Sequence, residues 1–153
     1  MIIKRLKGSK YKNKKVETEF GTFDSKKKST IHQFNPVIYP RILWVIVTDD
    51  PKDISDKFDS ECEYKSAFDT SKAFVLKCTE KDSGNLGICV CFRKRKFMNG
   101  INTIVHESVH IASCIFDDCS MTMGFSDGRD EHFAYLVGWA ADCINQVRTN
   151  KFK

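Results

Sequence analysis

The hydrophobic pattern changes along the chain from short apolar runs, which are typical of strands, to longer periodic stretches, which are typical of helices. The run ILWVIV is rich in β-branched residues and follows two prolines, so it predicts a buried strand that starts near Arg41. The segment PKDISDKFDS, residues 51–60, then predicts a short helix with Pro51 at its first position, where a missing N–H costs nothing.

A β-hairpin is predicted in the middle of the chain. The segments KAFVLKC (72–78) and LGICVCFRKRK (86–96) are joined by a polar connection that contains Gly84 and Asn85. In the second segment large and small residues alternate, so we expect one face to pack inward and the other to be smaller or wetter. The inward set is Leu86, Ile88, Val90 and Phe92, and the other set is Gly87, Cys89, Cys91 and Arg93.

Two helices are predicted to close the chain. In the first, at about 102–117, an apolar stripe recurs at helical spacing, and the second helix has a comparable stripe behind the capping pair Asp127 and Asp130. Because strands come first and helices last, the sequence predicts an α+β fold with a small antiparallel or mixed sheet. The first stripe is Val105, Val109, Ala112 and Phe116; the second is Phe133, Val137, Ala140, Ile144 and Val147.

Charge divides the chain into an arm and a domain. Residues 1–30 carry ten Lys/Arg against three acids, a net charge of +7, whereas the remainder carries fifteen against seventeen, a net charge of −2. We therefore expect a partly flexible basic arm at 1–30 and a single domain at 31–153. Such an arm is usually solvated, but its charge can also bind nucleic acid or an acidic protein.

Composition indicates where the protein is located and whether its cysteines form disulfides. The first residues are too charged for a signal peptide, and the longest apolar run is too short to span a bilayer, so we expect a soluble cytoplasmic protein with no membrane partner. The chain has seven cysteines, an odd number, and no paired CxxC. Reduced, partly buried thiols are expected rather than disulfides or a cysteine-only metal site.

The stretch INTIVHESVHIAS contains the strongest chemical motif. His106 and His110 are four positions apart, so on a helix both imidazoles can point at one ion about 2 Å away. Glu107 lies about 100° round the helix, beside the place where a zinc-bound water would lie. There it can take the proton of the water and later deliver it to a leaving amine. The alternative is an exposed helix face without a binding function, whose histidines bind nothing.

The segments HESVHIA (106–112) and DEHFAYLVG (130–138) resemble the zincin metallopeptidases, specifically the small gluzincin-like ones. The metzincin pattern is excluded because Ser113 and Phe116 stand where its glycine and third ligand would be. In the gluzincin pattern a glutamate about twenty residues downstream on a second helix completes the site, which implies Glu131, 21 residues after His110.

Other residues near Glu131 are also candidates for the third ligand, namely His132, Asp130 and Asp127. Small residues on the neighbouring face of the second helix, Ala134, Gly138 and Ala141, would let the two helices approach closely. Glu131 could instead only favour its helix N-terminus electrostatically.

The resemblance also implies how a substrate binds. The sequence departs from the family pattern at one position. In this family the last strand borders the cleft, and an extended substrate adds to its edge. Thermolysin-like enzymes carry an acid four residues after the third ligand, whereas this chain has Tyr135. Asp142 or a backbone carbonyl is then expected to orient a zinc histidine. Tyr135 is a candidate for stabilising the oxyanion, although tyrosines are more often packing residues.

The sequence therefore predicts a zinc metallopeptidase, weakly associated with phages and mobile elements. Zn²⁺ is held by His106, His110 and Glu131, Glu107 activates water, and Tyr135 assists. The substrate is a peptide or protein. The rival is a non-catalytic zinc-binding protein on a zincin scaffold that binds nucleic acid or an acidic protein through its basic arm. His32 is expected to be structural or exposed, and Trp44 and Trp139 to lie in the core.

Overall fold

The computed structural model describes residues 17–18, 21–22, 29–60, 63–124, 128 and 130–153. Two short strands, β1 (Glu17–Thr18) and β2 (Gly21–Thr22), pair with each other. Most of the predicted basic arm lies outside the described residues. The remaining elements are β3 (Thr30–Phe34), β4 (Ile42–Val47), α1 (Lys52–Ser55), β5 (Phe58–Ser60), α2 (Lys65–Thr70), β6 (Ala73–Glu80), β7 (Leu86–Phe92), the 3₁₀ helix η1 (Arg95–Met98), α3 (Ile101–Asp118) and α4 (Glu131–Thr149).

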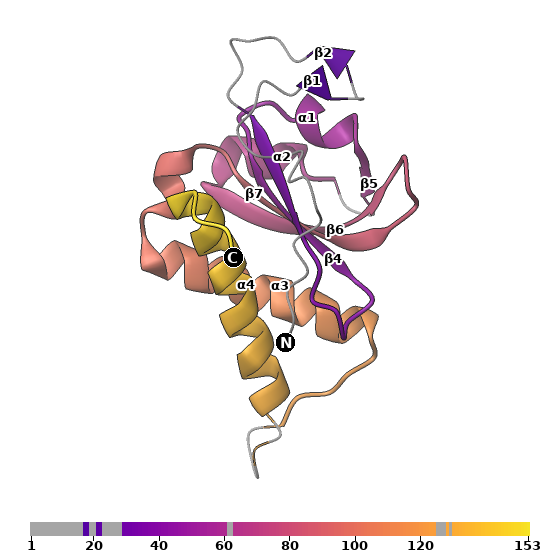
Figure 1. The fold of residues 1–153 in the computed structure, drawn as a ribbon, viewed down its shortest axis with the longest axis vertical. Coiled ribbons are helices and arrows are strands. Elements are labelled where there is room, and N and C mark those ends of the chain that lie inside the picture. Colours follow the sequence, from indigo (N-terminus) through magenta and orange to yellow (C-terminus); the bar gives the residue numbers. More distant parts are fainter. Residues whose placement is uncertain (1–16, 19–20, 23–28, 61–62, 125–127, 129) are drawn as a thin grey trace.

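A five-stranded mixed sheet forms the centre of the fold, in the order β3-β4-β7-β6-β5 (Figure 1). β4 and β7 pair in parallel, and every other pairing in this sheet is antiparallel. The α+β class, the strand after Arg41 and the β6–β7 hairpin are confirmed. β3 and α2 were not predicted, because neither carries a long periodic pattern.

Both faces of the sheet are buried. On one face α3 and α4 cover aliphatic side chains such as Val45, Ile88 and Val90 (Figure 1). On the other face Trp44, Cys89 and Cys91 pack with side chains from α1, β5 and α2. Of the two alternatives expected for the Cys89 face of β7, smaller or wetter, the wetter one is wrong, since Cys89 and Cys91 have no exposed surface. Leu86, expected to pack inward, is instead 50% exposed at the start of β7.

The segment 51–60 is only partly helical. α1 ends at Ser55, and the chain then forms the edge strand β5, which pairs with β6. Pro51 stands at the N-cap rather than at the first helical position. Pairing with β6 explains the difference, because a tertiary contact outweighs the weak local preference of so short a helix.

The buried face of α3 includes Ala112 and Phe116 of the predicted stripe but not its two valines. Val105 and Val109 are 44% and 39% exposed, whereas Ile104, Ile111 and Ile115 are fully or almost fully buried. Two adjacent faces of the helix were open to the sequence, because the valines at 105 and 109 and the isoleucines at 104, 111 and 115 both follow helical spacing. The longer isoleucines bury more apolar area, so their face is the favoured one.

α4 crosses α3 on the same side of the sheet, and its buried face is centred on Leu136, Ala140 and Cys143 (Figure 1). The expected close approach through small residues is wrong, because Gly138 is exposed and nothing lies within 4 Å of where its Cβ would be. Ala140, Ile144 and Val147 are buried as predicted, with Phe133 and Val137 partly buried.

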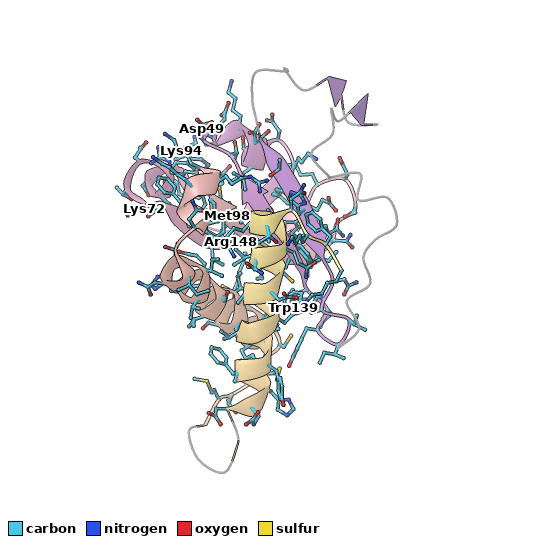
Figure 2. All side chains as sticks on the ribbon, turned by 60° about the vertical axis from the view of Figure 1, so that its left-hand side comes forward. Asp49, Lys72, Lys94, Met98, Trp139 and Arg148 are labelled. Atoms are coloured by element: carbon cyan, nitrogen blue, oxygen red, sulfur yellow. The ribbon has the colours of Figure 1, made fainter. Side chains whose placement is uncertain are left out.

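The ends of α4 are held differently. Asp130 is the N-cap but makes no side-chain capping bond, and Asp127 lies outside the described residues. At the other end the Arg95 guanidinium donates to the carbonyl oxygen of Val147 at 2.7 Å. Figure 2 shows Met98 of η1 and Arg148 at this end of the helix.

Trp44 and Trp139 lie in the core as expected. None of the described helices is long and apolar enough to cross a membrane.

Candidate metal centre

His106 and His110 meet on the exposed face of α3. Their Nε2 atoms are 3.1 Å apart, with ring centroids at 4.7 Å and ring planes at 79°. Two imidazole nitrogens in a tetrahedral zinc site, each about 2.0–2.1 Å from the ion, are separated by roughly 3.3 Å. The pair therefore has the spacing that a shared ion requires.

Local helix geometry places these two side chains. Residues i and i+4 lie one above the other, and the isoleucine face fixes which side of α3 turns outward. On that outward side Ser113 Oγ donates to the Val109 carbonyl at 2.9 Å. This bond leaves the serine hydroxyl occupied by its own helix.

Glu107 lies on the flank between the exposed face and the core. It is only 6% exposed, although its two histidine neighbours are exposed. Desolvation raises the pKa of its carboxyl, and the nearby His106 and His110 oppose that shift without cancelling it. A carboxylate beside an open metal position, with an increased affinity for protons, has the character of a general base.

The third ligand is not brought to this pair. In the described part of the chain no group of three or more His, Cys, Asp or Glu side chains lies close enough to hold a metal ion. Glu131, Asp130 and His132 are all exposed in the first turn of α4 or just before it. The two imidazoles thus fit a zinc ion, but the described geometry supplies two protein ligands where a catalytic site needs three.

Two further candidates lie on the outer face of α4. Tyr135 is 69% exposed, so it is not a core packing residue. Asp142 accepts a bond from Gln146 Nε2 at 3.0 Å and pairs with Lys153 Nζ at 3.3 Å. Its described contacts are to its own helix and the C-terminal residues, not to a histidine of α3.

One edge of β6 is only partly paired among the described residues. Among the described residues β5 pairs only with Cys78, Thr79 and Glu80, so the first half of β6, Ala73–Lys77, has no strand on that side. α3 packs against β6. An extended chain added to this edge would therefore lie along the helix that carries His106 and His110.

Ion pairs at the end of α3 were missed by sequence reasoning. Asp118 pairs with Arg41 at 2.7 Å and with Lys77 at 2.8 Å, and Lys77 also bonds Asp117. Burial acts to raise the pKa of Asp118, but the bonds to Lys77 and Arg41 outweigh it and leave that pKa below its usual value. The two aspartates at 117 and 118 were a possible signal, but their partners are far away in the sequence.

His32 was expected to be structural or exposed, and it is buried. It lies in β3 at 4% exposure, its ring stacks on Phe152 at 5.1 Å, and its Nε2 atom has no hydrogen-bond partner among the described residues. Desolvation, helped by the positive charge of Arg95, lowers the pKa of His32 to about 4. A neutral, buried imidazole of this kind is a core residue rather than a metal ligand.

Comparison of the chain with protein-family models, with curated proteins and with solved structures returns no match.

Proposed function

We propose that this protein is a zinc-dependent metallopeptidase. The observation that carries the proposal is the pair of imidazoles, His106 and His110, whose Nε2 atoms converge to 3.1 Å on an exposed helix face with Glu107 beside them. Two neutral imidazoles hold this separation through one N–H···N hydrogen bond, and a shared zinc ion would hold nearly the same separation. The ion is favoured because Glu107 lies beside the pair, in position for a general base.

Each residue of the motif has a separate role in this proposal. When bound, zinc supplies a water molecule whose pKa is lowered toward neutrality. Glu107 would hold the proton taken from the attacking water and pass it to the leaving amine. Its position on the desolvated flank of α3 supports this role, because burial makes its carboxylate a better proton acceptor than a solvated one.

Glu131 is proposed as the third ligand. It stands in the first turn of α4, 21 residues after His110, and its exposed side chain is not fixed by packing. In the described geometry it is not grouped with the histidines, so binding zinc requires the first turn of α4 to approach α3. Tyr135, one turn further along, is proposed to stabilise negative charge on the substrate carbonyl.

The proposed substrate is a peptide or an unstructured protein segment. The open edge of β6 offers main-chain N–H and C=O groups to an extended chain, and such bonds give affinity without strong sequence preference. Exposed Ile101, Val105 and Val109 flank the histidines on α3 and offer apolar contact to substrate side chains. We propose that the enzyme acts in the cytoplasm.

The test is the activity of Glu107→Gln with full zinc. The amide keeps the shape of the side chain but does not accept a proton at neutral pH, so hydrolysis of an unstructured test protein should fall by at least about 10²-fold. Zinc content should stay at one per chain. Glu63→Gln is the matched control, since Glu63 is exposed and lies outside the metal centre. Near wild-type activity of Glu107→Gln contradicts the mechanism.

The non-catalytic alternative rests on the charge of +7 in residues 1–30. In that case a zinc-loaded protein cleaves nothing, while a polyanion such as single-stranded DNA binds with an affinity that falls steeply with salt. Removal of residues 1–28 then abolishes binding. Equal behaviour of wild type and Glu107→Gln in every assay would favour this alternative.

A further inference from the structure

Two cysteines meet in the sheet on the face opposite α3. Cys78 in β6 and Cys89 in β7 have their Sγ atoms 3.0 Å apart, and both side chains are buried. A disulfide has a sulfur–sulfur distance of about 2.05 Å, so a movement of about 1 Å, shared between the two side chains, would close the bond. Neither residue belongs to the proposed metal centre.

The register of the hairpin explains why the sulfurs approach. Cys78 is directly opposite Gly87, and Cys89 is opposite Leu76, so the two cysteines are diagonal neighbours. Gly87 has no side chain to lie beside Cys78, and a Cβ there would be 2.1 Å from the Ile42 carbonyl oxygen and 2.5 Å from the Trp44 ring. The Trp44 ring and the Ile42 carbonyl fill the space that a side chain at residue 87 would need, so the thiol of β7 that Cys78 meets is the diagonal one, Cys89.

Cys78 is the more exposed of the two cysteines, at 5% against 0% for Cys89. Cys78 lines a pocket of about 250 Å³ whose wall also includes Arg41, Lys77 and Thr79. Cys89 is fully buried, and desolvation together with the neighbouring Cys78 raises the pKa of its thiol well above the usual value. Because Cys78 has the larger exposed fraction of the two, we take its thiol as the first to be oxidised.

We propose that Cys78 and Cys89 form a redox-active pair that a peroxide converts into an intramolecular disulfide. The Cys78 sulfur attacks one oxygen of hydrogen peroxide, the O–O bond breaks, and sulfenic acid and one water are produced. The Cys89 sulfur then attacks the Cys78 sulfur, the S–O bond breaks, and the departing hydroxide takes the Cys89 proton to form a second water. Two thiols are oxidised and one peroxide is reduced.

The neighbouring cysteine provides a matched control. Cys91 lies on the same strand and the same face as Cys89, but its Sγ is directed to the carbonyl oxygen of Thr48 at 4.0 Å. It is buried like Cys89 and does not line the pocket. Cys91→Ser thus removes a thiol from the same core without removing either member of the pair.

The experiment treats full-length reduced protein with hydrogen peroxide, quenches it and counts free thiols after unfolding. The count in wild type should fall by two, from seven to five, and the mass by about 2 Da. Peptide mapping should place the new bond between Cys78 and Cys89, and dithiothreitol should restore both thiols. Cys91→Ser should lose two thiols in the same way, and Cys78→Ser should not form this bond.

A second measurement keeps the test independent of how well the serine variants fold. Wild type is unfolded in denaturant and alkylated, with and without earlier peroxide treatment of the folded protein, and protection of Cys78 and Cys89 together is expected only after peroxide. The proposal is overturned if Cys78 is converted to sulfinic acid with Cys89 still reduced. It is also overturned if oxidation joins other cysteines, such as Cys114 and Cys119, or two chains, while this pair stays reduced.

Discussion

The two long helices bury similar aliphatic faces but differ in what they present to solvent. On α3 the outward side brings His106 and His110 together at 3.1 Å, with Glu107 on the adjoining flank. On α4 the outward side carries Glu131, Tyr135 and Gly138, which make no shared cluster among the described residues. The comparison separates the part of the proposed metal centre that α3 forms alone, the histidine pair, from the part that depends on α4, the third ligand.

The histidine pair depends only on the pitch of a single helix. Any α-helix places residues i and i+4 on one face, so His106 and His110 converge wherever α3 lies in the fold. A ligand from α4 depends in addition on the crossing of the two helices and on the approach of the first turn of α4. The predictions below test this contrast between a local pair and a distant partner.

The largest expected effect is on zinc binding by the histidine pair. His106→Ala or His110→Ala should abolish the one zinc per chain expected in wild type, because too few ligands remain for a tight site. Elemental analysis after purification without chelators measures this, with the buried histidine variant His32→Phe as control. Unchanged zinc in both alanine variants, or no zinc in wild type, would contradict the proposal.

The second prediction compares the two sides of α3. Ile111→Ala should lower the free energy of unfolding by about 2–5 kcal/mol, since Ile111 is fully buried and the change leaves a cavity. Val109→Ala, on the histidine side, should change it by no more than about 0.5 kcal/mol. Urea denaturation of the zinc-free protein gives both values. Equal losses would show that both sides of the helix are buried.

The third prediction concerns the pH dependence of stability that the buried imidazole of His32 causes. The pKa of His32 is about 4 in the folded protein and 6.5 in the unfolded chain, so the unfolded chain takes up the proton first as pH falls. Stability should therefore be complete above pH 6.5 and decrease by about 3 kcal/mol as pH falls toward 4.

His32→Phe should remove that part of the pH dependence, while the exposed His132→Gln should leave it in place. The measurement is urea denaturation of the three proteins at several values between about pH 7.5 and pH 4. If wild type and His32→Phe lose stability in parallel, His32 is not the group responsible.

The fourth prediction tests the distant partner. If Glu131 is the third ligand, Glu131→Ala should weaken zinc binding at least about tenfold, whereas Asp130→Ala and His132→Ala should not, because neighbouring helical side chains diverge by about 100°. Competition with a chromophoric chelator measures the affinity. A larger loss in His132→Ala or Asp127→Ala would move the assignment to that residue.

The smallest expected effect is at Gly138. Because no atoms lie within 4 Å of its Cβ position and its backbone is helical, Gly138→Ala should stabilise the zinc-free protein by about 0.5–1 kcal/mol. The free energy of unfolding of Gly138→Ala should also be measured in zinc-loaded protein. Destabilisation only when zinc is bound would show that the helices close on this face around the ion.

Sequence reasoning succeeded where the pattern is local. The limits of α3, the β6–β7 hairpin and the strand after Arg41 follow from periodicity and turn residues within single segments. It failed for the buried face of α3, because the face of Val105 and the face of Ile104 both follow helical spacing. It also failed for residues 58–60, which were predicted as helix and instead pair with β6 as a strand. The Cys78 and Cys89 contact was invisible because it depends on strand register.

The parallel pairing of β4 with β7 has a consequence for how the chain folds. These strands are the centre of the sheet, yet β5 and β6 separate them in sequence, so Ile42 pairs with Gly87 across 45 residues. Closing so long a loop costs chain entropy before any contact compensates for it, whereas the hairpin and α3 form from neighbouring residues. We expect β6, β7 and α3 to assemble first and β4 to dock last, so the helix that carries the histidines acquires its shape before the sheet is complete.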